Sequence, residues 1–365
     1  MNRLRRSERG YAAIFLAVFL FSIGVFFAYA LARTVYFSFT DYNLFDKPSW
    51  VGLRNYTELF RESLFLVALR NTLAYALIVT SLQTFFALVL AALLDQKLRG
   101  ITLFRTVFYL PSVLSSAAIT LIFLWLYQRS GFINFAVTWV LAHAPILVTF
   151  VGLLVLVQAV QVWNERRQNL PAQPLDLALL TLSVLIAAVV TGLLVWAGVV
   201  GPREGVRFEQ VWLNTSEMFL GLPVPLWAII LQNIFTTIPT FMLLFLAGLQ
   251  DVPETLYEAA AIDGATRVQQ FFRVTVPMLR PITFLVVTLS LIGTLQLFDQ
   301  VALFGSATPL ESRISLAYYV FLAAFPEGGQ SQIGLSSAAA LVLAALTLLI
   351  VLLQRRFGIS EQGYA

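Results

Sequence analysis

Eight long apolar stretches constrain the fold of this chain more than any other feature of its sequence. A helix that crosses a bilayer needs about 20 mostly apolar residues, and lipid does not tolerate unpaired backbone groups, so such stretches fold as transmembrane helices. The predicted spans cover residues 11–32, 64–94, 106–127, 144–163, 175–200, 223–249, 282–304 and 333–353. The sequence therefore predicts an all-α polytopic membrane protein with about eight transmembrane helices, organised as a single domain over residues 1–365.

Composition agrees with membrane insertion and excludes several kinds of site. Hydrophobic residues make up 59% of the chain and charged residues 12%, which is about half the charged fraction of a typical soluble domain. The chain has no cysteine and one histidine, which excludes disulfides and the usual zinc sites. That histidine, His143, is interpreted as an interfacial residue rather than a metal ligand. Because no phosphate-binding loop or hydrolase motif is present, we expect that the chain is not an enzyme and does not itself hydrolyse ATP.

The distribution of positive charge predicts the orientation of the chain in the membrane. Basic residues are scattered over short loops and form no patch, so no nucleic-acid partner is expected. With both termini placed in the cytoplasm, 14 of the 23 lysines and arginines lie in internal segments and 8 in external ones, as the positive-inside rule requires. The same topology places Arg166, Arg167 and the loop at 250–281 inside. The first apolar run is too long for the core of a signal peptide and is interpreted as a retained span.

The loop at residues 250–281 carries signals for two helices separated by a bend. Asp251 and Glu254 have the spacing of a capping pair, and Pro253 suits a first helical turn, so a helix is predicted to begin near Val252. Gly264 can end that helix in the left-handed conformation.

A second, amphipathic helix should follow this bend. Thr266 and Gln269 have the spacing of a capping box, which would start the helix. Pro277 should stop it. The loop is therefore predicted to fold as a helix, a glycine bend and a second helix.

The same loop resembles the EAA motif of ABC importer permeases. The matching positions are Glu258, Ala259, Ala260, Asp263, Gly264 and Pro277. The sequence AAIDGA is similar to the motif of the carbohydrate-uptake branch of this family, the maltose-type sugar permeases. In that family the loop is a pair of coupling helices seated in a cleft of a cytoplasmic ATPase, where Glu258 would face a basic group and the two alanines would permit close approach. The alternative is an amphipathic helix pair that lies on the membrane surface without a partner.

Other strings resemble the same family, with one interruption. FSFTDYNL, VGLRNYTELF and FRTVFYLPSVLSS match its pattern, as does the string RNT at 70–72, where Arg70 lies close enough to the end of its span to reach the external surface. The pattern lapses after Asn134 and resumes before the EAA loop. The resemblance thus implies a type I ABC importer permease fold with a transmembrane hairpin inserted at residues 144–200.

Polar residues on two of the later spans are candidates for a substrate pathway. Carried over from the resemblance by distance from the EAA glutamate, the positions that would line a sugar site are Asn233, Thr237, Ser290, Thr294 and Leu297. Asp299 is added as a pathway or gate residue, because a carboxylate facing lipid would be costly. The alternative for the hydroxyl and amide groups is hydrogen bonding between neighbouring helices.

The sequence is identified with the permease subunit of an ABC importer that moves an oligosaccharide, disaccharide or polyol into the cytoplasm. The implied partners are a cytoplasmic ATPase dimer, a second permease in a heterodimer, an external sugar-binding protein and the lipid bilayer. ATP and Mg would be bound by the ATPase, with no cofactor in this chain. The implied location is the bacterial cytoplasmic (inner) membrane, with both termini cytoplasmic. An ion-coupled secondary transporter is the alternative, although such proteins commonly show ionisable residues at the midplane and two matching halves.

Overall fold

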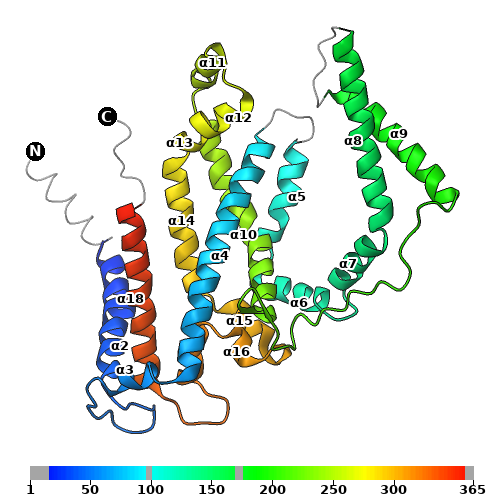
Figure 1. The fold of residues 1–365 in the computed structure, drawn as a ribbon. Coiled ribbons are helices and arrows are strands. Elements are labelled where there is room, and N and C mark those ends of the chain that lie inside the picture. Colours follow the sequence, from blue (N-terminus) through cyan, green and yellow to red (C-terminus); the bar gives the residue numbers. More distant parts are fainter. Residues whose placement is uncertain (1–15, 96–100, 169–175, 358–365) are drawn as a thin grey trace, which may run out of the picture. The chain divides into compact units, whose positions relative to one another are not determined.

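The computed structural model describes residues 16–95, 101–168 and 176–357, which form two compact units (Figure 1). Unit 1 contains the residues up to Phe123 and from Leu213 onward, and unit 2 contains Leu124–Trp212. The arginine-rich N-terminus, the beginning of the first predicted span and much of the link at 164–174 lie outside the described residues.

Unit 1 is built almost entirely from helices. Its elements before unit 2 are η1 (Ile23–Tyr29), α2 (Ala30–Ser38), α3 (Arg54–Leu59), α4 (Ser63–Leu94), α5 (Ile101–Val113) and most of α6 (Ser116–Leu126). After unit 2 come β1 (Met218–Phe219), β2 (Leu222–Pro223), α10 (Val224–Gln250), α11 (Glu254–Ile262), α12 (Arg267–Gln270), η2 (Phe271–Thr275), α13 (Val276–Met278) and α14 (Arg280–Leu295). The last elements are α15 (Asp299–Phe304), η3 (Gly305–Ala307), α16 (Leu310–Arg313), α17 (Leu316–Ala324) and α18 (Ile333–Phe357). The two short strands pair antiparallel as a hairpin directly before α10.

Helix α4 lies at the centre of unit 1, where it packs against both α10 and α14 (Figure 1). Small residues of α4, Ala87 and Ala91, meet larger buried residues of α10, including Met242 and Phe245. A side chain at Gly248 would place its Cβ 2.7 Å from Ile282 of α14. This glycine therefore lets α10 and α14 approach closely, as small residues do between membrane helices.

Unit 2 contains a helical hairpin made of α8 (Ala144–Arg167) and α9 (Leu177–Trp196), preceded by the short α7 (Phe132–Ala142). The two helices of the hairpin pack on one another. The hydroxyl of Ser183 donates to Gln158 at 2.6 Å and to Gln161 at 3.3 Å. These polar groups of the hairpin therefore bond to one another inside it.

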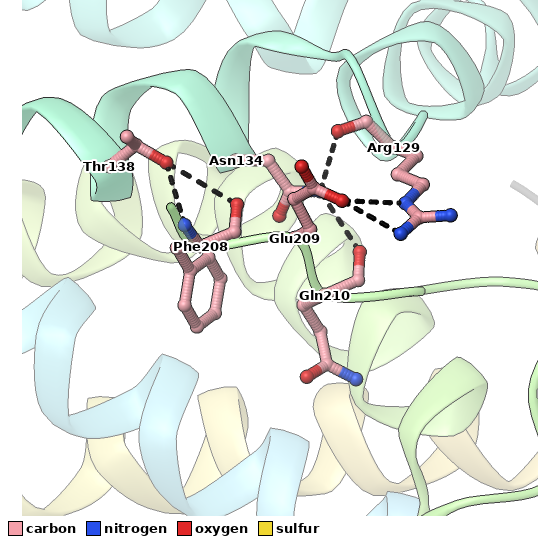
Figure 2. Close-up of polar contacts among 6 residues, drawn as sticks. All are labelled: Arg129, Asn134, Thr138, Phe208, Glu209 and Gln210. Carbon is pink, nitrogen blue, oxygen red and sulfur yellow. Dashed lines mark hydrogen bonds and ion pairs between the residues drawn. The ribbon is translucent and has the colours of Figure 1, made fainter. Parts of the chain in front are cut away.

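The segment that leaves the hairpin runs back along α7 and is fastened to it (Figure 2). The backbone of Phe208 exchanges hydrogen bonds with the Thr138 hydroxyl, and Asn134 donates to the carbonyl of Gln210 at 2.9 Å. Arg129 forms an ion pair of 2.7 Å with Glu209. The polar side of α7 is therefore covered by its own chain, and α7 itself is too short to cross a bilayer.

Among the described residues, seven helices are long and apolar enough to span a membrane, and the bent pair α5–α6 makes an eighth candidate. The predicted count of about eight spans is therefore confirmed. The first span continues to Ser38, six residues beyond its predicted end, and α8 continues to Arg167. The apolar stretch near residue 320 forms α17, which at nine residues is too short to cross.

The predicted third span, 106–127, corresponds to the bent pair α5–α6. The chain bends by 97° between α5 and α6. Pro111 lies inside α5, and the break follows at Leu114 and Ser115. The Ser115 hydroxyl accepts a hydrogen bond of 3.2 Å from the amide of Ala118, which starts a new helix as an N-cap does. Span 282–304 is interrupted in a similar way, by three non-helical residues between α14 and α15.

Candidate functional site

The first helix of the EAA loop begins later than predicted. Helix α11 starts at Glu254 with Pro253 as its N-cap, and Asp251 instead ends α10. The residue before a proline is pushed out of helical geometry, so Val252 cannot begin the helix. The helix therefore begins two residues after Val252, close to the predicted start, whereas the predicted capping role of Asp251 is wrong.

The glycine bend forms as predicted. Gly264 has φ of +77°, and two hydrogen bonds close the end of α11: Ala265 donates to Ala260 at 2.9 Å, and Gly264 donates to Ala261 at 3.0 Å. This is the Schellman arrangement, which requires a left-handed residue at the position of Gly264. A Cβ added there would meet no atom within 4 Å. The requirement for glycine at this position is therefore one of backbone conformation rather than of space.

The second helix starts as predicted but does not stop at Pro277. Thr266 and Gln269 form the complete capping box, with hydrogen bonds of 2.8 and 3.3 Å. The helix then widens into the π-helical segment η2 and continues as α13 to Met278. A proline ring clashes with the carbonyl four residues earlier in an α-helix, and the wider turn before Pro277 relieves that clash. The helix therefore ends at Met278, one residue after the predicted stop at Pro277.

The two helices of the loop are joined to each other, and the motif residues face outward. The hydroxyls of Tyr257 and Thr275 lie 2.9 Å apart across the bend. Glu258, Ala259, Asp263 and Gly264 are exposed, whereas Ala260 and Pro277 are half-buried. The most exposed large apolar side chains of the loop are Ile262 (86%), Val268 (66%) and Phe272 (65%). The loop thus presents a braced surface that is partly apolar, with an acid at its edge.

All six residues predicted for the pathway line one pocket of about 260 Å³ in unit 1. It is lined by Gln83, Asn233, Thr237, Phe241, Leu289, Ser290, Gly293, Thr294, Gln296, Leu297, Phe298, Asp299 and Gln300. Asp299 is the exposed first residue of α15, whereas Leu297 is buried. Residues from α10 and α14, which lie on either side of the EAA loop in the sequence, are therefore brought together.

Several pocket hydroxyls also bond between helices, so the two interpretations of these residues are compatible. Thr237 of α10 donates to the Gln83 amide oxygen at 2.6 Å, and the Gln83 amide donates to Ser290 of α14. Ser290 donates in turn to Thr80 at 2.8 Å, and Thr294 donates to the Ser290 carbonyl at 2.8 Å. Interhelical bonding alone does not describe these groups, because the same residues line the pocket.

Gln83 is a buried polar residue of the pocket that sequence reasoning missed. It is buried and bonds to both α10 and α14 from the middle of α4. An amide in the middle of a long apolar span was the available signal, since such groups are costly in lipid unless they have partners. His143 stacks on Trp139 with ring centroids 4.5 Å apart. No group of residues able to hold a metal ion occurs in the part of the chain that the structure describes.

The chain is similar in sequence to permeases of known transport systems. The probable ABC transporter permease YesP of Bacillus subtilis is 27% identical over 94% of this chain and 88% of its own. The multiple sugar-binding transport system permease MsmF of Streptococcus mutans is 28% identical over 93% of this chain and 92% of its own.

The fold is also similar to that of a solved transporter. A chain of the bacterial alginate ABC transporter, in complex with an alginate pentasaccharide-bound periplasmic protein, matches with a TM-score of 0.65. The identity is 19%, and the match covers 98% of each chain. The family model described as binding-protein-dependent transport system inner membrane component matches residues 83–358, about three quarters of the sequence. The chain therefore belongs to the family of binding-protein-dependent transport system inner membrane components.

Proposed function

We propose that this chain is the permease subunit of an ABC importer and that its pocket is part of the path of a sugar. The observation that carries this proposal is the convergence of six residues from α10, α14, the break after α14 and the start of α15 on one pocket. Amides, hydroxyls and a carboxylate dominate its polar lining. Such groups suit the many hydroxyls of a carbohydrate, because each can donate or accept a hydrogen bond.

The substrate proposed is neutral and rich in hydroxyl groups. Among the described residues, neither lysine nor arginine lines the pocket, whereas recognition of phosphate or carboxylate favours arginine. Asp299 would further disfavour an anion at this end of the pocket by charge repulsion. MsmF is named for several sugars, and the alginate transporter imports an acidic polysaccharide. Uptake of an acidic sugar should therefore be compared with uptake of a neutral one.

The EAA loop is the proposed contact with a cytoplasmic ATPase dimer, which would bind ATP and Mg and drive the transport cycle. Its exposed Ile262, Val268 and Phe272 provide apolar area for a partner, and Glu258 provides a charge beside it. A second permease in a heterodimer and an external sugar-binding protein complete the proposed assembly. Family membership favours this assembly over the ion-coupled secondary transporter, which would need none of these partners.

In the proposed topology both termini and the EAA loop face the cytoplasm of a bacterium. The hairpin α8–α9 would then lie outside the pathway and face lipid or a partner, because its polar groups Gln158, Gln161 and Ser183 bond to one another. At the other helix, Asp176 caps α9 by accepting hydrogen bonds from Ala178 and Leu179. This capping carboxylate is exposed and can remain hydrated at the cytoplasmic end.

The test is reconstitution of the purified permease, with the subunits that co-purify with it, in vesicles. ATP-dependent uptake of neutral oligosaccharides and of an acidic one should be compared in the presence of the sugar-binding protein. We expect uptake of a neutral sugar that stops without ATP. Uptake that follows an ion gradient and continues without any ATPase subunit would contradict the proposal.

A further inference from the structure

One wall of the pocket lies outside the long helices α4, α10 and α14. Residues Gln296–Gln300 line the pocket in succession, and this pocket wall contains the break between α14 and α15. Helix α15 is only six residues long and ends at Gly305, whose φ is +45°. At such helix ends the backbone carbonyls lack partners within the helix. The pocket wall therefore depends on other parts of the chain for its position.

Two buried side chains donate to backbone carbonyls at Leu297, within the pocket wall, and at Val301, directly after it. Ser315 donates to the carbonyl of Leu297 at 2.5 Å. Arg313 donates through Nη1 to the carbonyl of Val301 at 2.8 Å. Both donors come from the segment Leu310–Leu316, which we call the corner. Their acceptors bracket Phe298, Asp299 and Gln300.

The corner is itself fixed to the central helix α4. The side-chain amide of Asn71 donates to the carbonyls of Glu311 and Ile314, both at 3.1 Å. The Thr72 hydroxyl accepts a hydrogen bond of 2.9 Å from the amide of Leu316. Asn71 and Thr72 are 1% and 0% exposed, so these hydrogen bonds are shielded from water. The corner therefore bridges α4 and the pocket wall.

Arg313 occupies an unusual environment for a cation. Its side chain is 7% exposed, and it forms no ion pair with any acid among the described residues. The guanidinium carbon lies 4.9 Å from the ring centroid of Tyr318, and the Nε atom has no hydrogen-bond partner among the described residues. The Tyr318 ring in turn contacts Phe298 of the pocket wall, at 6.0 Å between centroids.

A buried cation without a carboxylate is costly to keep. Arg313 reaches the pocket wall by two routes: through the carbonyl of Val301, directly after the wall, and through Tyr318, which contacts Phe298. These contacts offset the cost of burying the cation and hold the wall in place. We propose that Arg313 is a positioning residue for the pocket wall, with Ser315 as its second fastening and α4 as the common support. The claim that this wall contributes to transport rests on the proposed function. The claim that Arg313 fixes its position does not.

The experiment measures the accessibility of the pocket wall directly. Since the chain has no cysteine, a single cysteine at the exposed Gln296 reports on the wall through its rate of reaction with a maleimide. The protein is the permease purified with its co-purifying subunits, in detergent and without any sugar. Arg313→Gln should change the labelling rate of Gln296→Cys by roughly threefold or more, because a pocket wall that has lost this hydrogen bond opens locally and exposes its residues to a different extent. Arg313→Lys should restore part of the original rate.

Two controls separate positioning from a general loss of stability. A cysteine at exposed Lys47, in the loop at 41–50, should react at the same rate with and without Arg313→Gln. Arg61→Gln, which removes an exposed arginine, should leave the rate at Gln296→Cys unchanged. If Arg313→Gln fails to assemble, the milder Ser315→Ala decides, since it removes one hydrogen bond to the same wall.

Unchanged labelling of Gln296→Cys in assembled Arg313→Gln or Ser315→Ala protein would overturn the proposal, even if both variants melted earlier. Because no sugar is present, a wrong substrate assignment would not alter this result. The failure of the positioning role and the failure of the proposed function are therefore distinguishable.

Discussion

Thr237 of α10 and Gln83 of α4 are joined by a hydrogen bond of 2.6 Å in the wall of the pocket. The two residues are far apart in the sequence, and the amide of Gln83 also reaches Ser290 of α14. A single side chain of the central helix therefore holds the two pocket helices at a set separation. The polar face of the pocket is consequently a property of three helices rather than of one.

Replacement of Gln83 by leucine should affect both stability and transport. The change removes the amide that accepts from Thr237 and donates to Ser290, but these hydroxyls keep other partners at Asn233 and Thr80. The stability cost should therefore lie near the lower end of about 1 to 3 kcal/mol for disrupting a buried hydrogen-bond pair. Thermal melting and sugar-stimulated ATP turnover of the assembled complex measure the two effects. A variant with wild-type turnover would exclude Gln83 from the pathway.

Asn233→Ala and Thr294→Ala should each lower sugar-stimulated turnover by about threefold to tenfold, the value of one hydrogen bond to the sugar. Both residues line the pocket, and assembly with the other subunits should be preserved. Thr240→Ala is the matched control, because Thr240 lies exposed on α10 away from the pocket. If Asn233→Ala and Thr294→Ala kept the turnover of the Thr240→Ala control with every neutral and acidic sugar tried, Asn233 and Thr294 would only bond neighbouring helices.

Gly264→Val should uncouple ATP hydrolysis from transport. A left-handed conformation costs an ordinary residue about 1 to 2 kcal/mol, and a β-branched side chain tolerates it poorly. Gly264→Asn is the control, because asparagine accepts this conformation and no neighbouring atom obstructs its side chain. Transport should be low for valine and close to normal for asparagine. Comparable transport by the two variants would show that the bend is not required.

Glu258→Lys should weaken the association with the ATPase, because it places a positive charge where a basic group of the partner is expected. Glu258 is exposed, so folding of the permease should not change. Co-purification of the ATPase at two salt concentrations measures the effect. Glu254→Lys on the same helix is the control for charge alone. If both variants retained the ATPase equally well and transported normally, the coupling role of the EAA glutamate would be refuted.

The topology of the hairpin can be tested by labelling single cysteines in intact cells. Gln168→Cys, at the end of α8, should be protected from an impermeant reagent added outside, because Arg166 and Arg167 of the same helix end favour the cytoplasm. Glu204→Cys should react from outside. Glu204 is a better position than the adjacent Gly205, whose φ of +75° would strain a cysteine. The reverse labelling pattern would exclude the eight-span topology.

The sequence alone determined the features that depend on neighbouring residues. Apolar length predicted the spans, because lipid leaves a long apolar run no alternative to a helix. The bend at Gly264 and the capping box of Thr266 and Gln269 could be predicted because glycine and capping side chains act within a few residues of themselves. The predicted pathway residues converge on one pocket, but their role with a substrate stays a prediction.

Only the tertiary structure decided the features in which contacts from distant residues override the conformation that the local sequence predicts. Pro277 should end a helix, yet a π-turn accommodates it. The break between α14 and α15 carries no strong signal in the sequence, because the carbonyls of Leu297 in the break and of Val301 after it are satisfied by Ser315 and Arg313 of a later segment. Gln83 became part of the pocket through contacts with two helices that follow it by more than a hundred residues. Such partners are chosen by packing in three dimensions, and that choice cannot be derived from the order of residues along one helix.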